Sequence, residues 1–398
     1  MNNDTLHESS ILSEWWKQID KWLLISLLIL MISGFLISLT INPTSIYINN
    51  IGILSIFSTQ HIYLIIGLLI SIGISMLRIN HLKKMILPLF IISFLLLFST
   101  LLIGQEWNGS KRWINLNYFT IMPIEFIKPF FCLALAFFLE SKTGQSNQYK
   151  YGISILSFIA IGVILVIQPD ISQFFLITSI FVSSIFISGF SFWIICLILF
   201  SGIFFSIFIY FFNFNVKNRI DSFLWPDGIN NYQPELAKEA INSGGLFGVG
   251  PGNGTLKIDL PEAYTDYIYA VIAEEFGIIG CIFILFIFLF IAYRVFIRLY
   301  DEKNHFLQIS LFSLIIYFSL QALIHISVNI SLTPSTGMTL PFISYGGSSI
   351  IGISITFGLI MLSLIHISEP TRPERISFGG VCVEKKRGGG GGGGGGGG

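Results

Sequence analysis

One aspartate combines an unusual position in the chain with usable chemistry. Asp266 stands in Leu-Pro-Glu-Ala-Tyr-Thr-Asp-Tyr-Ile-Tyr-Ala (260–270), where a glycine-rich polar segment turns into a long apolar stretch. A carboxylate at the mouth of a membrane helix can touch a water-soluble sugar while its neighbours hold a lipid tail. The helix dipole would lower the pKa of Asp266 and keep it ionised as a proton acceptor. The position predicts a membrane enzyme, with simple helix capping as the alternative.

Two oppositely charged residues lie inside an apolar stretch. Glu125 and Lys128 are three residues apart in Pro-Ile-Glu-Phe-Ile-Lys-Pro (123–129), so they share one helical face. An ionisable side chain deep in a bilayer costs about 2.5–3.5 kcal/mol, which makes each a functional candidate. The alternative is a self-neutralising pair that only tolerates burial. The two prolines favour surroundings of protein or a wet cavity, because these satisfy the backbone groups that proline frees.

Cations and tryptophans precede this pair. Gly-Ser-Lys-Arg-Trp-Ile (109–114) places Lys111 and Arg112 beside Trp113. Arginine binds phosphate through paired hydrogen bonds and lysine acts as a point charge. Tryptophan is typical of the membrane interface. The segment predicts a phosphate-binding site, against the alternative of cations that merely reach the headgroups.

Two further polar groups lie in apolar stretches. Glu274 and Glu275 follow Asp266 by eight and nine residues, and either proton-coupled transport or a hydrogen-bonded structural role would suit them. Gln321, His325 and Asn329 share one helical face, which favours hydrogen bonds between helices.

The glycine-rich segment 243–254 superficially resembles a phosphate-binding loop. It lacks the following Gly-Lys-Ser or Gly-Lys-Thr and no strand precedes it. We therefore predict a close-approach turn packed over the membrane cavity.

The composition excludes a water-soluble domain. Apolar residues make up 53% of the chain and charged residues 11%, so too little polar surface exists to coat a soluble fold. The formal net charge of zero argues against nucleic acid as a partner. Cys132, Cys196 and Cys281 lie in apolar stretches and Cys382 lies in the tail, which implies neither a disulfide framework nor a metal site.

Apolar runs near the length that crosses a bilayer recur along the chain. About 20 residues span the roughly 30 Å of hydrocarbon. We predict an all-α polytopic membrane protein with about ten transmembrane helices and a large extracytoplasmic loop, residues 213–263, between helices 7 and 8. The expected helices are Trp22 to Leu39, Ile62 to Leu77, Ile86 to Ile103, Ile121 to Leu139, Tyr151 to Ile167, Ile171 to Ser188, Phe190 to Phe212, Tyr264 to Tyr293, Phe306 to Ile330 and Ile343 to Ile367. Only Ser188 and Gly189 separate the sixth from the seventh, so nine or eleven helices remain alternatives.

The cations of the short loops predict the orientation. One side carries Lys17, Lys21, Arg78, Lys83, Lys84, Lys142, Lys150, Arg294, Arg298 and Lys303, and the other carries Lys111 and Arg112. By the positive-inside rule the N-terminus is cytoplasmic, which places the loop and Asp266 outside.

Segments of different character flank the membrane domain of residues 22–367. Residues 1–21 predict an interfacial amphipathic helix, because Ile11, Leu12, Trp15, Trp16, Ile19 and Trp22 recur at helical spacing. The polar, acidic start of the chain is not typical of a cleavable signal peptide. Residues 368–398 end in eleven glycines and differ in composition from the rest, which indicates a non-native or disordered tail.

Four separated segments resemble the SEDS family of membrane peptidoglycan glycosyltransferases (shape, elongation, division, sporulation). They are Lys111 to Ile114 with Glu125 and Lys128, then Gln168-Pro169-Asp170, then Gly244 to Asp266, and finally Gly337 to Ser349. Thr336-Gly337-Met338-Thr339-Leu340-Pro341 and the Gly-Pro-Gly at 250–252 are more similar to the FtsW (cell-division) branch than to the RodA (elongation) branch. Ile124 and Tyr264 depart from the Ser and His usual in the family, whereas Asp266 is retained.

The resemblance implies polymerisation of lipid II, the undecaprenyl-linked disaccharide peptide, into glycan strands during septal wall synthesis. Asp266 would be the catalytic base of a single inverting displacement of undecaprenyl diphosphate. No second outer carboxylate is evident beside it. The implied substrate-binding residues are Lys111, Arg112, Trp113, Glu125, Lys128, Asp170, Ser344, Ser348 and Ser349.

The resemblance also implies a cofactor, protein partners and a cellular location. A divalent cation, Mg or Mn, is expected, with ligands that the sequence leaves unknown, and no nucleotide or redox cofactor. A class B penicillin-binding transpeptidase and other divisome membrane proteins are the expected partners, in the bacterial cytoplasmic (inner) membrane. Two alternatives stay open: a lipid II flippase using the buried Glu125, Lys128, Glu274 and His325, or a membrane scaffold for the transpeptidase.

Overall fold

The computed structural model describes residues 13–40, 53–107, 110–116, 120–140, 147–189, 200, 202, 207, 210–211, 214–225 and 232–367. The first part of the predicted amphipathic helix, most of the predicted seventh span and the tail 368–398 lie outside the described residues.

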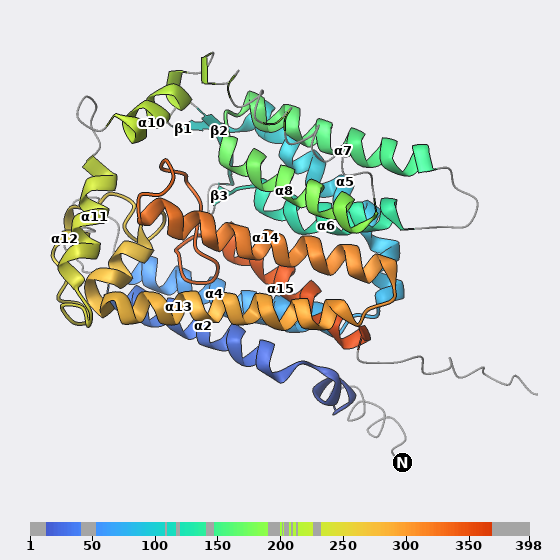
Figure 1. Ribbon diagram of the computed structural model, residues 1–398, viewed down its shortest axis with the longest axis horizontal. Coiled ribbons are helices and arrows are strands. Elements are labelled where there is room, and N and C mark those ends of the chain that lie inside the picture. The colour runs from blue at the N-terminus through green and yellow to red at the C-terminus, as the bar shows by residue number, and fades with distance from the viewer. Residues whose placement is uncertain are drawn as a thin grey trace, which may run out of the picture.

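Apolar helices form most of the structure (Figure 1). In lipid every backbone N–H and C=O must be paired within the protein, and a helix does this within one segment. The helices are α2 Lys21–Thr40, α4 Ile53–Ser75, α5 Ile79–Ile103, α6 Ile124–Leu139, α7 Asn147–Ile167, α8 Ile171–Ile187, α13 Ile268–Tyr300, α14 His305–Asn329 and α15 Gly347–Ile367.

Six of the described helices are long and apolar enough to cross a bilayer: those in Lys21–Thr40, Ile79–Ile103, Tyr149–Ile167, Ile268–Tyr300, His305–Asn329 and Gly347–His366. The apolar segments Thr59–Ser75 and Ile171–Ile187 are shorter. A multi-pass, mostly helical membrane protein is thus confirmed, whereas the number of ten helices stays a prediction.

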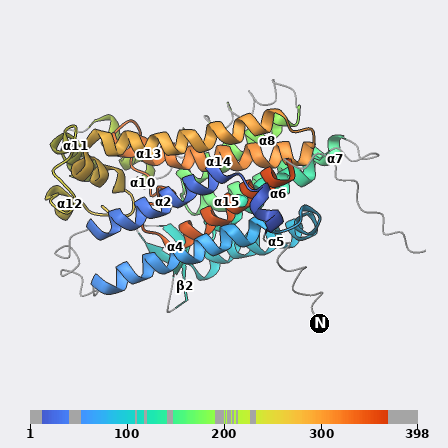
Figure 2. The ribbon, with the colours of Figure 1, turned by 90° about the horizontal axis from the view of Figure 1, so that it is seen from below.

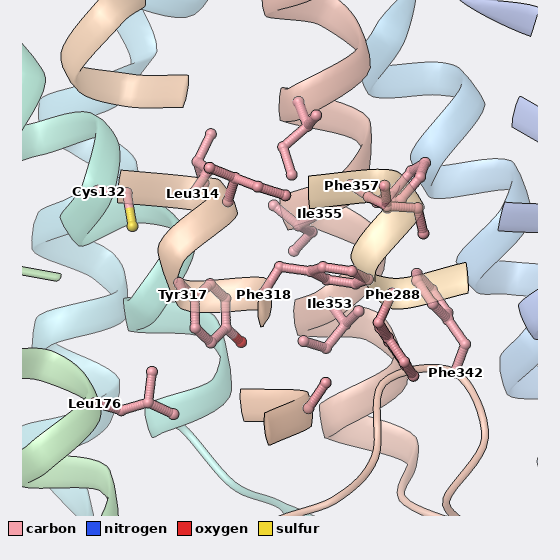
Figure 3. Close-up of a cluster of buried hydrophobic side chains, with 14 of the residues drawn as sticks. Cys132, Leu176, Phe288, Leu314, Tyr317, Phe318, Phe342, Ile353, Ile355 and Phe357 are labelled. Carbon is pink, nitrogen blue, oxygen red and sulfur yellow. The ribbon is translucent and has the colours of Figure 1, made fainter. Parts of the chain in front are cut away.

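Helix α15 lies at the centre of the bundle (Figure 2). In its most apolar stretch 94% of the residues are buried, as expected of a helix that is hydrophobic all round. The ring of Phe357 packs 5.8 Å from Phe318 of α14 and 5.9 Å from Phe342, measured between ring centroids (Figure 3). This aromatic core ties α15 to its neighbours.

A small antiparallel sheet interrupts the helices and corrects the all-α prediction. Its order is β1 (Gln105–Trp107), β2 (Ser110–Asn115) and β3 (Thr120–Ile121). Along strand β2 the more exposed and less exposed side chains alternate, as expected of a strand whose two faces differ in exposure. The predicted fourth span was therefore wrong to begin at Ile121, and α6 instead begins at Ile124 behind Pro123.

The described part of the predicted outer loop contains three helices: α10 Phe214–Leu224, α11 Tyr232–Gly244 and α12 Leu256–Asp259. They gather at the end of the bundle where α13 begins (Figure 1). The eighth predicted span was placed too early, because α13 begins at Ile268 and a series of turns precedes it.

The glycine-rich segment fills a break in α13. Gly277 has φ +68° and ψ −170°, outside the helical region. The N–H groups of Ile278 and Ile279 donate instead to the carbonyls of Gly245 and Leu246, at 3.0 and 3.3 Å. The segment thus supplies acceptors that the broken helix cannot.

Close backbone approach explains the glycines of this segment. A Cβ on Gly248, at φ +80°, would lie 2.1 Å from the carbonyl oxygen of Glu275. The N–H groups of Val249 and Gly250 donate to the carbonyls of Glu274 and Glu275, at 2.9 and 3.1 Å. The prediction of a close-approach turn is confirmed, although the turn packs on α13.

Candidate active site

A cavity of about 320 Å³ opens at the end of the bundle that carries α10 and α11. Its lining comes from β2, α6, α10, α11, the turns before α13, and the segment from Ser335 to Ser349. Asp266 lies in this lining. Residues from six separate parts of the chain therefore meet at the predicted catalytic carboxylate.

Asp266 is held by its backbone, which leaves its carboxylate to the cavity. Its N–H donates to the carbonyl of Glu262 at 3.0 Å, across a turn in which Glu262 has φ +58°. Its own carbonyl accepts from Nδ2 of Asn329 at 3.0 Å, and Oδ1 of Asn329 accepts from the N–H of Ala270 at 3.0 Å. The residue at the N-cap is Tyr267, without a side-chain capping bond, so capping is not the role of Asp266.

The surroundings raise the pKa of Asp266 to about 7, which corrects the prediction of a lowered value. Removal from bulk water is the largest cause and the neighbouring Glu262 is the second, whereas Arg219 and Arg112 act in the opposite direction. Desolvation thus outweighs any benefit from the helix dipole. At neutral pH about half of the Asp266 carboxyls carry a proton.

Glu262 overturns the expectation that no second outer carboxylate accompanies Asp266. It lines the same cavity, and its Oε2 accepts from Oγ1 of Thr265 at 2.7 Å. The left-handed backbone at Glu262 turns the chain back on itself, which the sequence did not reveal because such a conformation is uncommon outside glycine.

Arg112 is fixed beside the cavity by the Pro169-Asp170 segment. Its Nε lies 3.2 Å from Oδ2 of Asp170, and its Nη2 donates to the carbonyl of Pro169 at 2.9 Å. Asp170 also caps α8, with Oδ1 accepting from the N–H of Gln173 at 3.3 Å. Asp170 therefore orients Arg112 and does not itself line the cavity.

Arg219 on α10 is a cavity residue that the sequence analysis missed. Removal from bulk water and, second, the charge of Arg112 lower the pKa of its guanidinium, so the two cations act on a common region. An apolar groove of about 310 Å³ adjoins them, between α8, α10 and α14. Arg112 and Arg219 line both the cavity and this groove.

The groove is lined by the apolar residues Ile171, Phe175, Val216, Ile220, Ile324 and Pro334. The polar cavity, two cations and the apolar groove thus follow one another in space. This sequence of surfaces matches an amphiphile whose anionic group lies between a polar head and an apolar tail.

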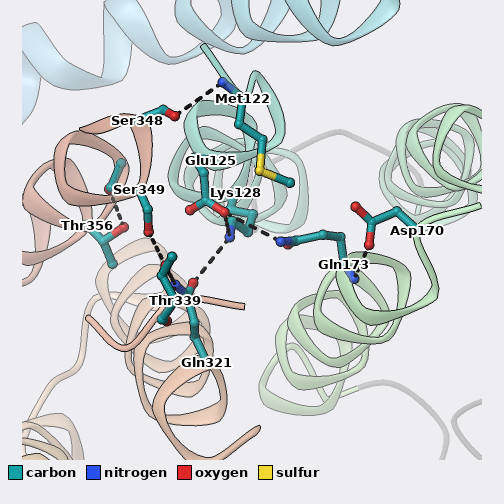
Figure 4. A network of polar contacts seen from close by, with 11 residues as sticks. Met122, Glu125, Lys128, Asp170, Gln173, Gln321, Thr339, Ser348, Ser349 and Thr356 are labelled. Atoms are coloured by element: carbon teal, nitrogen blue, oxygen red, sulfur yellow. Dashed lines mark hydrogen bonds and ion pairs between the residues drawn. The ribbon is translucent and has the colours of Figure 1, made fainter. Parts of the chain in front are cut away.

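The predicted pair of Glu125 and Lys128 forms (Figure 4). Lys128 is fully buried, and its Nζ donates to Oε1 of Glu125 at 2.8 Å and to Oε1 of Gln321 at 3.2 Å. Oε2 of Glu125 makes no hydrogen bond within the described residues, and Glu125 lines the cavity. The pair therefore neutralises itself at the edge of the cavity, with Oε2 of Glu125 buried.

The three predicted serines divide into two groups. Ser348 and Ser349 line the cavity. Ser344 does not: its Oγ accepts from the N–H of Leu340 at 2.8 Å and donates to the carbonyl of Thr265 at 2.7 Å. Ser344 thus supports the residue next to Asp266.

The structure gathers six of the ten predicted site residues around the cavity: Arg112, Trp113, Glu125, Asp266, Ser348 and Ser349. Lys111, Lys128, Asp170 and Ser344 lie outside its lining. Lys111 is exposed on β2 opposite Glu106.

The other buried polar groups have structural partners. Glu274 accepts from the N–H groups of Leu256 and Lys257, at 2.9 and 3.1 Å, and Glu275 pairs with Nζ of Lys257. Nδ1 of His325 lies 2.7 Å from the carbonyl oxygen of Met338. These contacts confirm the structural role that the sequence left as one alternative for the glutamates.

Comparisons with known proteins identify a sequence family and a shared fold. Residues 20–369 match the sequence family of FtsW, RodA and SpoVE, described as cell cycle proteins. A relative from Caulobacter vibrioides, "Probable peptidoglycan glycosyltransferase FtsW", is 33% identical over 372 residues, covering 90% of this chain and 92% of its own.

Solved structures share the fold. A chain from a structure titled "Structural coordination of polymerization and crosslinking by a peptidoglycan synthase complex" gives a TM-score of 0.73 at 24% identity, covering 87% of this chain and 97% of its own. The rod shape determining protein RodA of Thermus thermophilus gives a TM-score of 0.66 at 23% identity, covering 88% of this chain and 98% of its own.

Proposed function

The chain belongs to the FtsW, RodA and SpoVE family of cell cycle proteins, and we propose that it joins lipid II disaccharides into glycan strands as a peptidoglycan glycosyltransferase. The observation that carries this proposal is the position of Asp266 in a polar cavity that two arginines separate from an apolar groove. A lipid-linked sugar diphosphate has these three parts in this order.

Asp266 would act as the general base. In its ionised form it takes the proton from the 4-hydroxyl of the acceptor GlcNAc, whose oxygen bonds to the anomeric carbon of the lipid-linked MurNAc. The bond to undecaprenyl diphosphate breaks on the opposite face, so the configuration inverts. A pKa of about 7 suits this role, because a base is most effective when its pKa lies near the working pH.

Arg112 and Arg219 would hold the leaving diphosphate. Negative charge develops on this group as the bond breaks, and fixed donors aimed at such charge are a large source of catalysis. The adjoining groove would take the first part of the isoprenoid chain. Glu125, Ser348, Ser349 and Trp113 would then contact the sugars.

The cavity also fits a divalent cation. No group of three or more potential metal-binding side chains is found among the described residues. Glu262 and Asp266 nevertheless share the cavity, and Mg²⁺ is commonly held by one or two carboxylates together with substrate phosphates. We propose Glu262 as its protein ligand, and a bound cation would offset charge on the diphosphate.

The remaining expectations fit this activity. We propose ten transmembrane helices, an extracytoplasmic position for residues 213–263, and a cytoplasmic N-terminus in the bacterial inner membrane. A class B penicillin-binding transpeptidase and other divisome membrane proteins are the proposed partners. The flippase alternative is less favoured, because Glu274 and His325 serve structural contacts away from the cavity.

The test is polymerisation of labelled lipid II by the purified protein with its partner and a divalent cation. Asp266→Asn should lower the rate about a hundred- to ten-thousand-fold, the usual contribution of a general base. Full-length strands made by Asp266→Asn at the wild-type rate would exclude Asp266 as the base.

A second variant tests the diphosphate site. Arg219→Gln should lower kcat about a hundredfold or more, the typical loss of one donor to a developing anion. Lys217→Gln is the matched control, because Lys217 is an exposed cation on the same helix that lines neither the cavity nor the groove. Equal losses in both variants would show that only the general charge of α10 matters.

A further inference from the structure

A second polar cavity lies at the opposite end of the bundle from Asp266. Helix α2 runs from Lys21 to Thr40, and the carbonyl of Thr40 accepts from Nζ of Lys257 beside the start of α13. Lys21 is therefore at the far end, as is the last part of α13. Between the two helices is a cavity of about 380 Å³.

The lining of this cavity is strongly cationic. Among the described residues it contains Lys17, Lys21, Arg294 and Arg298 but only one carboxylate, Asp20, which gives these side chains a formal charge of +3. Such an excess requires an anion or solvent to balance it.

Asp20 is already committed to other contacts. Its Oδ1 accepts from the N–H groups of Trp22 and Leu23 at 3.1 and 3.4 Å, which caps α2. Its Oδ2 lies 2.9 Å from Nε of Arg294 and 3.9 Å from Nε of Arg298. Since one carboxylate serves two arginines and a helix start, it leaves Lys17 and Lys21 without a carboxylate partner in the described part of the cavity, where Nζ of Lys21 lies 5.7 Å from the ring centre of Trp16.

The cavity lies at the level of a membrane surface. Trp16 and Trp22 flank it and are 51% and 59% exposed, as is typical of tryptophan at a bilayer interface. From here toward the middle of the bundle, α2 and α13 present exposed apolar side chains, Ile25 and Ile32 on α2 and Phe296 on α13. An anion bound here would have apolar surface directly beside it.

We propose that this cavity binds the phosphate headgroup of an anionic phospholipid, whose acyl chains lie along α2 and α13. Cationic pockets between helices at the cytoplasmic side recognise such headgroups. The apolar surface beside the cations favours a lipid over a free phosphate ion. The bound lipid would join the segment before α2 to α13, independently of the chemistry at Asp266.

The test measures lipid binding by the full-length protein. The protein is placed in nanodiscs of phosphatidylcholine alone or with phosphatidylglycerol, and retained lipid is counted by native mass spectrometry after extraction. Wild type should retain phosphatidylglycerol and gain thermal stability from it. Lys17→Gln with Lys21→Gln should bind it about 30-fold more weakly, from roughly fivefold for each cation removed.

Lys84→Gln with Lys303→Gln is the matched control. Both residues are exposed lysines outside the cavity, in segments that adjoin the same end of the bundle. Lys17→Arg with Lys21→Arg should keep the affinity, because it keeps the charge. The proposal is overturned if the control pair loses as much binding, if phosphatidylcholine is retained equally well, or if inorganic phosphate alone gives the same stabilisation.

Discussion

Replacing Glu262 with Gln should shift the pH profile of polymerisation to lower pH. Only the ionised form of Asp266 can accept the proton of the attacking hydroxyl, and the charge of Glu262 is the second cause of the raised pKa of Asp266. Removing that charge lowers the pKa of Asp266 and extends activity to more acidic conditions. Arg219→Gln should shift the profile the other way, because Arg219 stabilises the ionised form.

The magnitude follows from the pKa. A rise from 3.8 to about 7 corresponds to roughly 4 kcal/mol against the ionised carboxylate. In the wild type about half of the Asp266 side chains are ionised at pH 7 and about a tenth at pH 6, so kcat/KM should fall about fivefold between them. Burial remains in Glu262→Gln, so its profile should move only part of the way toward that of an ordinary aspartate.

The assay records initial rates of strand formation from labelled lipid II at subsaturating concentration across this pH range. Profiles are recorded at low and at saturating divalent cation, because a cation bound to Glu262 would cancel the charge that raises the pKa of Asp266. The shift in Glu262→Gln is therefore expected at low cation and should shrink at saturation. Glu239→Gln is the control, because Glu239 is an exposed carboxylate on α11 outside the cavity.

The reasoning would be refuted if the wild-type profile were flat from about pH 5 to pH 8, since no group near 7 would then control the rate. It would also fail if Glu262→Gln moved the acid limb to higher pH, or if Glu239→Gln moved it as far as Glu262→Gln does.

Three further predictions concern the stability of the site and its supports. Asp266→Asn should raise the melting temperature more at about pH 8 than at about pH 5. The raised pKa means that ionising Asp266 destabilises the folded protein above pH 7, and this cost fades as the pH falls toward 3.8. An equal gain at both pH values would contradict the prediction. Gly248→Ala should destabilise the protein more than Gly252→Ala. Both positions have φ +80°, so an alanine at either incurs about 1–2 kcal/mol for the left-handed backbone, but only the Cβ at position 248 would meet a carbonyl oxygen, 2.1 Å away. Matching melting temperatures would show that the segment moves away from α13. Lys257→Met should lower the free energy of unfolding by about 3–5 kcal/mol, because it leaves the buried Glu275 unpaired. Lys257→Met with Glu275→Leu should recover most of this loss, as measured by thermal unfolding in detergent. No recovery in the double variant would mean that the loss comes from packing and not from charge.

The sequence alone determined the membrane class, most of the helices and the residue at the centre of the site. Apolar runs of sufficient length report directly on a bilayer, because the hydrophobic requirement acts on each segment separately. The pairing of Glu125 with Lys128 was also predictable, since three residues along a helix bring two side chains to one face. Asp266 was identifiable because an ionisable side chain next to a membrane-spanning segment is unfavourable and is therefore a candidate for a functional role.

Only the tertiary structure decided what surrounds Asp266. Arg219 lies 47 residues before it in the chain, and Glu262 approaches it through a left-handed turn, so no local pattern joins these charges. The pKa of Asp266 was predicted in the wrong direction for the same reason: the dipole of its helix is a local property, whereas its removal from water depends on every segment that closes the cavity. The use of the glycines to repair the break in α13 is likewise a contact between distant backbones. Local periodicity specifies which residues form each helix, but the charge state of the site depends on how those helices pack.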